Sequence, residues 1–320
     1  MRRVLMFLTL VTALLLGGVP AQAIINGVED GYEHPNVGAV IWHFGDIDEY
    51  VFVCSGSLVT QQIFLTAAHC DPAFTPPEWQ TTVAGVTFET ALDLSTFVPA
   101  SQFVRHPDYD DAAWPYTPDI GVIHLAEPVV GIELVELPEA GLVNAIRSEP
   151  AFRRQLLTQV GYGQVGVTHG GGSPQQIYPN IRKYASGWVR LEKGKPTGLD
   201  VDYLFRTAHP GGPGGDGGTG CFGDSGGPFL LGDAASNQQV GVFSGTGAVG
   251  PDGILCRTEN FAFRLDTATA RAFLCGQDIA AACETGATVA QDNTVPIVSK
   301  KTAKESVTKK AAKDKQEKQD

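Results

Sequence analysis

Short apolar runs separated by turn-forming residues dominate the chain between about residues 37 and 249. The runs are rich in β-branched and aromatic residues, and Gly, Pro, Asn or Asp interrupt them. Examples are VGAVIW, FVCSGSLV, FLTAAH, IGVIHLAEP, LTQVGYG and QVGVFSG. Runs of this kind predict short β-strands joined by tight turns, as in an all-β barrel or sandwich.

One convincing helix is predicted, near the end of this region. Asp266 can cap it, and the following TATARAFLC places Ala270, Phe273 and Leu274 on one face. We expect this helix over about residues 266–275. Two other segments should be irregular: a Gly-rich stretch and the C-terminal tail described below. The Gly-rich RTAHPGGPGGDGGTG (206–220) predicts a mobile loop.

The first 23 residues have the three parts of a secretory signal peptide. Two arginines precede the apolar run VLMFLTLVTALLLGG, and the small residues AQA follow it. At about 15 residues the run is shorter than the ~20 that a membrane-spanning helix needs. An N-terminal membrane anchor is the alternative. No cysteine closely follows the run, which disfavours a lipoprotein anchor. We expect a secreted protein, extracellular or periplasmic, with no transmembrane segment after signal removal.

The charge distribution disfavours a nucleic-acid partner. Residues 24–299 hold 13 basic and 31 acidic residues, a net charge of −18, and phosphate binding needs a basic face. From about Thr285 the chain loses its aromatic residues and becomes rich in Lys, Ala, Glu and Gln. We expect residues 286–320 to form a disordered tail. A short amphipathic helix or a basic handle for anionic cell-surface polymers is the alternative.

The chain has six cysteines, at positions 54, 70, 221, 256, 275 and 283. An even number in an exported chain indicates disulfides, but about 15 pairings are open from the cysteine count alone. No CxxC pair is present and the histidines are scattered, so a structural zinc site is not expected.

Three motifs carry candidate chemistry: LTAAHC with His69, PDIGVIHL with Asp119, and CFGDSGGP with Ser225. Taken singly, each has a simple structural explanation. Together, in this order, they supply a nucleophile, a base and an orienting carboxylate. The glycines around Ser225 would let the N–H groups of Gly223 and Ser225 point at one spot, as an oxyanion hole requires.

These motifs make the chain resemble the chymotrypsin/trypsin-like serine endopeptidases, peptidase family S1. Further similarity lies in IING at residue 24, CSGSLV, VRHPDYD (104–110), VGYG (160–163) and GVFSG (241–245), so that the resemblance spans about residues 24–275. It implies a protease domain over 24–285 with two antiparallel six-stranded β-barrels, at about 24–145 and 146–265, before the helix. His69 and Asp119 would come from the first barrel, and Ser225 from the second.

The resemblance also implies disulfide pairings. Cys54–Cys70 would clamp the histidine loop and Cys221–Cys256 would brace the binding pocket, which leaves Cys275–Cys283 to close a small loop after the helix.

In this family the new amino terminus folds inward and pairs with the aspartate before the nucleophile, here Ile24 with Asp224. A buried charge without a partner is costly, so the pair would shape the turn that carries Gly223 and Ser225. Because AQA directly precedes IING, we hypothesise that signal peptidase makes the activating cut. Cleavage elsewhere, followed by trimming by a second protease, is the alternative.

The resemblance places Thr219, Ser244, Thr246 and Asn260 at the substrate pocket. Thr219 stands six residues before the nucleophile, where an aspartate would demand a basic substrate side chain. Thr246 and Asn260 stand where many relatives have glycine. We therefore expect a preference for small or medium neutral side chains, which Asp216 in the Gly-rich loop could modify. SGT (244–246) stands where SWG is common, and a bridge often found in the middle of the second barrel is absent.

Two other functions compete with a protease. A catalytically inactive relative could act as a binding module, but the chain keeps Gly223, Asp224, Ser225 and Gly226. An α/β-hydrolase esterase is excluded by motif order, because that fold runs Ser, Asp, His. We expect a monomer acting on protein or peptide substrates, with a protein inhibitor as a further class of partner. No cofactor is implied, and no ligands can be assigned for the calcium that some family members bind.

Overall fold

The computed structural model describes residues 24–114, 116–147, 149, 151, 155–168, 175–190, 203–206, 218–246, 256 and 260–283. The predicted signal peptide, most of the Gly-rich loop with Asp216, and the predicted tail lie outside the described residues. Within the described ranges, no helix has the length and apolarity needed to cross a bilayer.

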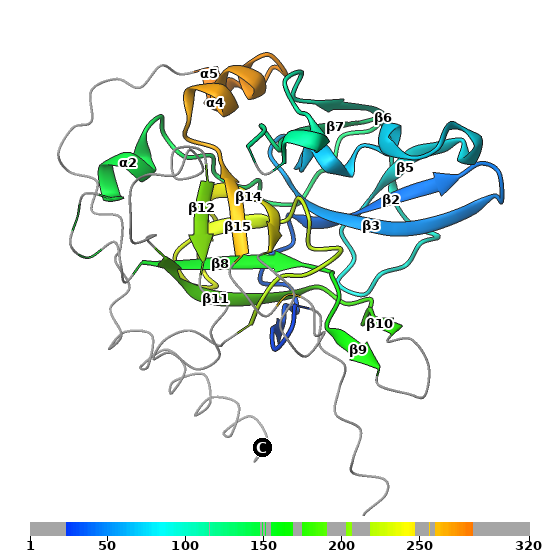
Figure 1. The fold of residues 1–320 in the computed structure, drawn as a ribbon, viewed down its shortest axis with the longest axis horizontal. Helices are drawn as coiled ribbons and strands as arrows, with labels where there is room; N and C mark the ends of the chain where they lie inside the picture. Colours follow the sequence, from blue (N-terminus) through cyan, green and yellow to red (C-terminus); the bar gives the residue numbers. More distant parts are fainter. Residues whose placement is uncertain are drawn as a thin grey trace, which may run out of the picture.

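Six strands from the first half of the chain form a closed antiparallel barrel, seen at the right of Figure 1. Their order around the barrel is β2-β3-β4-β7-β6-β5. Alternate side chains point inward, so that Val40, Phe64 and Ile123 meet in one core. The strands are β2 (Val37–Phe44), β3 (Glu49–Leu58), β4 (Ile63–Thr66), β5 (Thr81–Thr87), β6 (Val98–Arg105) and β7 (Gly121–Leu125).

The second half forms a seven-stranded sheet in the order β1-β11-β12-β15-β14-β13-β8. An additional pairing of β11 with β8 joins six of these strands into a ring, with β1 on its edge. The all-β prediction is confirmed. The strands are β1 (Val28–Glu29), β8 (Leu156–Gly161), β11 (Lys183–Arg190), β12 (Tyr203–Arg206), β13 (Pro228–Leu231), β14 (Gln239–Thr246) and β15 (Asn260–Arg264), with a separate pair of β9 (Gly166–Thr168) and β10 (Gln175–Ile177).

The N-terminal segment belongs to the second sheet, and not to the first barrel as the resemblance implied. Val28 pairs with Tyr184 of β11, and Ile25 forms an isolated bridge with Thr219. The chain therefore starts against the second sheet and then crosses to build the first barrel. This route places the segment from residue 24 beside the motif that contains Ser225.

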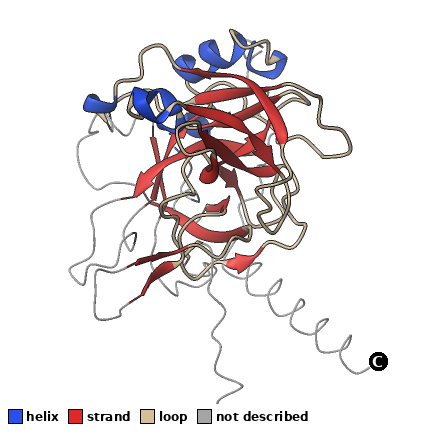
Figure 2. Cartoon of the chain, turned by 90° about the vertical axis from the view of Figure 1, so that its right-hand side faces the viewer, coloured by secondary structure: helices blue, strands red, loops and turns tan. Residues whose placement is uncertain are grey.

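The predicted C-terminal helix is α4 (Ala268–Cys275), and Ala270, Phe273 and Leu274 are buried on it as expected. Figures 1 and 2 show it at one end of the molecule, next to α5 (Ala280–Cys283). Its apolar face packs into the same core as the first barrel. The helix therefore covers the barrel with a face that the periodicity predicted.

The predicted cap and the number of helices were wrong. Thr267, and not Asp266, caps α4, by accepting a hydrogen bond from the N–H of Ala270 at 3.2 Å. The Asp266 carboxylate instead accepts from the Arg264 guanidinium and from the N–H of Val143 at 2.8 Å. The latter contact lies in α2 (Leu142–Arg147), a short helix that, like α5, the sequence pattern did not predict.

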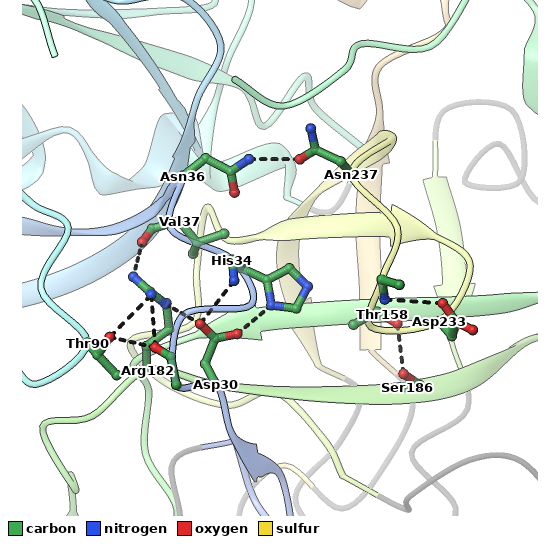
Figure 3. A network of polar contacts seen from close by, with 12 residues as sticks. Asp30, His34, Asn36, Val37, Thr90, Thr158, Arg182, Ser186, Asp233 and Asn237 are labelled. Atoms are coloured by element: carbon green, nitrogen blue, oxygen red, sulfur yellow. Dashed lines mark hydrogen bonds and ion pairs between the residues drawn. The ribbon is translucent and has the colours of Figure 1, made fainter. Parts of the chain in front are cut away.

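A fully buried arginine joins the N-terminal segment to both halves of the molecule (Figure 3). The Nε of Arg182 donates to Asp30 Oδ2 at 2.7 Å, and its Nη1 donates to the carbonyls of Val37 at 2.9 Å and Phe88 at 3.0 Å. Asp30 also contacts His34, through the backbone N–H and the ring Nδ1. Burial raises the pKa of Asp30, but His34 and Arg182 outweigh it and hold that pKa below its usual range.

We predict that this buried ion pair matters far more to stability than an exposed one. Replacing Arg182→Met leaves the Asp30 carboxylate buried without its cation, which typically costs about 3–5 kcal/mol. A matched control is Arg105→Met, because Arg105 pairs with Asp71 while 38% exposed. Such pairs contribute about 0–1 kcal/mol. Urea unfolding measures both changes.

The double variant Asp30→Asn/Arg182→Met should lose less stability than the sum of the single variants, because contacting partners are not additive. Equal, small losses for Arg182→Met and Arg105→Met would contradict this account of the junction.

Candidate functional site

His69 and Asp119 are brought together by two paired strands. His69 lies in a 3₁₀ turn (Ala68–Cys70) just after β4, and Asp119 lies just before β7, which pairs with β4. The His69 Nδ1 is 2.8 Å from Asp119 Oδ2, and the His69 N–H donates to Oδ1 at 3.1 Å. The strand register therefore brings together the two side chains that the motifs singled out.

Asp119 is fully buried and accepts hydrogen bonds on both carboxylate oxygens. A further donor to Oδ2 is the Ser244 hydroxyl, at 2.5 Å. The carboxylate favours the tautomer of His69 with its proton on Nδ1, which leaves Nε2 as an acceptor. The imidazole side chain is 26% exposed, so Nε2 can accept a proton from a group in the solvent-accessible cleft.

Ser225 lies in a turn that only glycine allows at two positions. Gly223 and Gly226 have φ angles of +91° and +81°. A Cβ on Gly226 would lie 2.1 Å from Thr66 Oγ1, and one on Gly223 would lie 2.9 Å from a ring carbon of Phe52. Among the described residues, the N–H groups of Gly223 and Ser225 have no acceptor. Two backbone donors next to the Ser225 side chain are therefore unengaged in the described part of the chain, which is one requirement of an oxyanion hole.

Ser55 of β3 attaches this turn to the first barrel. Its N–H donates to the Ser225 carbonyl at 2.8 Å, and its hydroxyl donates to the Gly223 carbonyl at 2.9 Å. The same hydroxyl accepts from the N–H of Tyr162 at 3.1 Å. Because these contacts use the carbonyls of the turn, the N–H groups on its other side remain available.

His69, Gly223 and Ser225 line one cleft of about 950 Å³. Two of the predicted pocket residues, Ser244 and Thr246, line it as well. The remaining lining is strongly aromatic: Trp42, Phe52, Tyr109, Trp114, Tyr178, Phe222, Phe243 and Phe261. The cleft therefore suits an apolar ligand that reaches His69 and Ser225.

The other two predicted pocket residues are buried and bonded to each other. Thr219 Oγ1 donates to Asn260 Oδ1 at 3.1 Å, and the Asn260 amide also bonds both backbone groups of Gly220. Neither side chain lines the cleft formed by the described residues. The resemblance implied that both residues lie at the substrate pocket; the structure brings the two positions together but leaves their side chains outside this cleft.

Ile24 and Asp224, the implied activation pair, are both fully buried. Ile25 exchanges two backbone hydrogen bonds with Thr219, each 3.0 Å long. The Asp224 carboxylate accepts from the N–H groups of Gly163 and Cys221, both at 2.8 Å. The N-terminal segment is thus held close to the Ser225 motif, while the residues before Ile24 lie outside the described part.

The structure contains the disulfides Cys54–Cys70, Cys221–Cys256 and Cys275–Cys283, the pairs that the resemblance implied. Cys54, His69 and Cys70 form a group of potential metal-ligand types. Both sulfurs are in a disulfide and cannot act as thiolates, so this group does not resemble a zinc site.

Three residues in the cleft or next to the Ser225 turn were not found from the sequence. Trp114 donates its indole N–H to Ser244 Oγ at 3.2 Å. Ser55 bonds the carbonyls of the Ser225 turn, and Tyr162 donates its backbone N–H to the Ser55 hydroxyl. A tryptophan five residues before Asp119 was the one available signal for Trp114. Nothing in the sequence indicated the roles of Ser55 and Tyr162.

Comparison with known proteins agrees with this geometry. The model of the Trypsin family matches residues 32–262. Over 181 residues the chain is 29% identical to vitellin-degrading protease of Bombyx mori, a match that covers 55% of this chain and 61% of that protein. It is 24% identical over 276 residues to trypsin of Sarcophaga bullata, covering 80% and 94%.

A match to trypsin V-A of Rattus norvegicus has 31% identity over 90 residues, 27% of this chain and 34% of that protein. The chain thus spans less than two thirds of some curated relatives that it matches. The solved structure of HL collagenase superimposes with a TM-score of 0.56 at 21% identity, covering 80% of this chain and 99% of that one. That likeness supports the fold.

The two rings of strands and the cleft define a trypsin-like architecture. Since the family model covers well over half of its length, the chain belongs to the trypsin family.

We predict that the pKa of His69 lies above its ordinary value and depends on two carboxylates. Burial alone would lower this pKa, but Asp119 and, more weakly, Asp111 raise it. Replacing Asp111→Asn should lower the pKa modestly, and Asp119→Asn should lower it further. An NMR titration of the His69 ring measures each value. Asp46→Asn, an exposed change of equal charge in the β2–β3 turn, is the control and should leave the titration unchanged.

Proposed function

We propose that the protein is a secreted serine endopeptidase that hydrolyses peptide bonds through an acyl-enzyme intermediate. The observation that carries this proposal is the His69–Asp119 contact of 2.8 Å on a cleft that also exposes Ser225. Membership of the trypsin family supports a peptidase function. The disulfides are typical of an oxidising compartment and support secretion.

The proposed reaction gives each of these groups one role. Ser225 Oγ attacks the peptide carbonyl carbon while His69 Nε2 takes its proton, and Asp119 stabilises the resulting imidazolium. The carbonyl oxygen becomes an oxyanion, which the N–H groups of Gly223 and Ser225 stabilise. When the carbon–nitrogen bond breaks, His69 returns the proton to the leaving amine and the acyl group stays on Ser225. Water then attacks the ester by the same route, which releases the acid and restores Ser225.

The preference at P1, the substrate residue whose carbonyl is attacked, should be neutral. Thr219 carries no charge, and its hydroxyl is already bonded to Asn260. Its side chain does not line the described cleft, so position 219 offers no carboxylate to a basic P1 side chain, whose burial without a counter-charge would be costly. Thr246 lines the cleft, where its side chain takes up space that a glycine would leave open. Small or medium neutral side chains avoid both penalties.

We predict that Ala, Val or Leu peptides are cleaved faster than the matched Arg peptide, in an assay of synthetic tetrapeptide amides. Ser225→Ala should lower kcat by about a million-fold, the loss typical of a removed serine nucleophile. Ser101→Ala, an exposed serine on β6, is the matched control and should retain activity. Faster cleavage after Arg would contradict the pocket assignment, and equal rates for both serine variants would contradict the nucleophile.

Cleavage before Ile24 is proposed to activate the protein. The cut would create an ammonium group on a residue that is buried and joined by Ile25 to Thr219. That ammonium would neutralise Asp224, whose carboxylate is already oriented by Gly163 and Cys221. The predicted signal peptide ends directly before Ile24, so signal peptidase alone would suffice.

We expect N-terminal sequencing of the secreted protein to begin at Ile24. A variant with Ala inserted between Ala23 and Ile24, cut at the original site, should be secreted but poorly active, because its ammonium is displaced from Asp224. A fully active secreted form that begins at any other residue would contradict this proposal.

The second candidate function is an inactive, trypsin-like binding module. No feature of the site favours it, and the contact of His69 with Asp119 supports the peptidase instead. A protein that is correctly cut at Ile24 yet hydrolyses none of the peptides would favour that function.

A further inference from the structure

Trp114 occupies the space beside Gly245, the residue that follows Ser244 on β14. A Cβ on Gly245 would lie 2.7 Å from Cζ2 of Trp114 and 3.1 Å from a ring atom of Phe261. A side chain at position 245 therefore cannot coexist with Trp114 in this place. The indole and the Phe261 ring pack together with centroids 5.3 Å apart.

The position of Trp114 is set by the loop between β6 and β7. Asp110 caps the short turn Asp111–Ala113 by accepting from the N–H of Ala112 at 3.0 Å, and its own N–H donates to Thr117 Oγ1 at 2.7 Å. The Trp114 N–H closes this turn by donating to the Asp111 carbonyl at 3.2 Å. The loop is thus ordered by its own polar groups, and it places Trp114 in the lining of the cleft.

The indole is also connected to the catalytic candidates. Its N–H donates to Ser244 Oγ at 3.2 Å, and that hydroxyl donates to Asp119 Oδ2 at 2.5 Å. Trp114 remains 39% exposed and lines the cleft, so part of its apolar surface faces the ligand space. Polar contact on one edge and open apolar surface on the rest are typical of tryptophan at binding sites.

We propose that Trp114 forms the apolar wall that selects the substrate residue next to P1, on its amino-terminal side, termed P2. This inference rests on the proposed peptidase function. Gly245 lies between Ser244, which contacts the Asp119 carboxylate, and Thr246, which lines the candidate P1 pocket. An apolar wall over Gly245 therefore contacts the substrate side chain next to the one held in the candidate P1 pocket. Substrates with an aliphatic or aromatic P2 residue gain contact with Trp114 and Phe261, whereas Gly or a charged P2 residue does not.

The test compares kcat/KM for tetrapeptide amides that share a neutral P1 residue and differ at P2, with Leu, Phe, Gly or Asp. In the natural protein the Leu and Phe peptides should exceed the Gly peptide by about tenfold or more, as for a hydrophobic subsite. Trp114→Ala should reduce this Leu-to-Gly ratio about tenfold. Trp114→Phe keeps an apolar ring without the N–H donor, and should retain most of the ratio. Trp79→Ala, which removes a similarly exposed tryptophan (42%) outside the cleft lining, is the matched control.

Gly245→Trp provides a reciprocal test. Alone, it places a side chain where Trp114 already lies and should lower kcat/KM for every peptide. Combined with Trp114→Ala, it supplies an aromatic ring to the vacated space and should restore preference for apolar P2 residues. Recovery in the double variant would not follow if Trp114 acted only in folding.

The outcomes separate this proposal from the peptidase proposal. A Trp114→Ala protein that keeps the natural Leu-to-Gly ratio overturns the wall and leaves the peptidase intact. If Trp114→Ala fails to fold, the ratio of Trp114→Phe decides, and its loss overturns the proposal. If the natural protein hydrolyses nothing, the peptidase proposal fails. Calorimetry then measures the binding of the same peptides to the natural protein and to Trp114→Phe. Equal affinity of the natural protein for the Leu and Gly peptides would overturn the proposed wall.

Discussion

The contact of Ser55 with the Ser225 turn is the interaction on which the site depends. His69 and Asp119 come from the first barrel and Ser225 from the second ring of strands, so their relative positions depend on how the two halves meet. Ser55 bonds the carbonyls of both Ser225 and Gly223, while Thr66, three residues before His69, donates to the Ser55 carbonyl at 2.9 Å. These hydrogen bonds connect the loop of His69 with the turn of Ser225 through very few residues.

Buried charged side chains also restrain the segments that contact Ser55 and the Ser225 turn. Arg182 donates to the Tyr162 hydroxyl at 3.1 Å, and Tyr162 and Gly163 donate their N–H groups to Ser55 and Asp224. Burial raises the pKa of Tyr162 to about 12, so its hydroxyl stays neutral and donates to the Glu89 carbonyl. Because unpaired buried charges are costly, Arg182 and Asp224 both restrict where the neighbouring chain can lie. The N-terminal segment contacts both regions: Asp30 pairs with Arg182, and Ile25 bonds Thr219 in the segment before Asp224.

The parts of this structure that the sequence could predict are those that depend on local pattern. Short apolar runs between turn residues predicted the strands, and the helix periodicity placed Phe273 and Leu274 correctly. The motifs around His69, Asp119 and Ser225 identified candidate chemistry because each carries its own glycines or flanking strand. The cap of α4 was misjudged because Asp266 forms stronger, charge-assisted bonds with Arg264, and the neighbouring Thr267 remained free to cap.

The parts that could not be predicted depend on contacts between distant segments. The sequence shows that no tryptophan follows Ser244. It does not show that Trp114, 131 positions before Gly245, fills the space beside that glycine. Likewise, the sequence gives no sign that Arg182 is buried. Its burial with Asp30 depends on the pairing of β1 with β11. Short helices such as α2 have too few residues for periodicity to reveal, and tertiary packing stabilises them instead.

The most direct test of the central claim is covalent labelling of the secreted protein with a fluorophosphonate, followed by intact mass measurement and peptide mapping. An activated serine beside a base should react once per molecule, at Ser225, and the Ser225→Ala variant should not react. Labelling that also disappears in His69→Ala would support activation by the imidazole. A correctly folded protein, beginning at Ile24, that takes up no label would contradict the account.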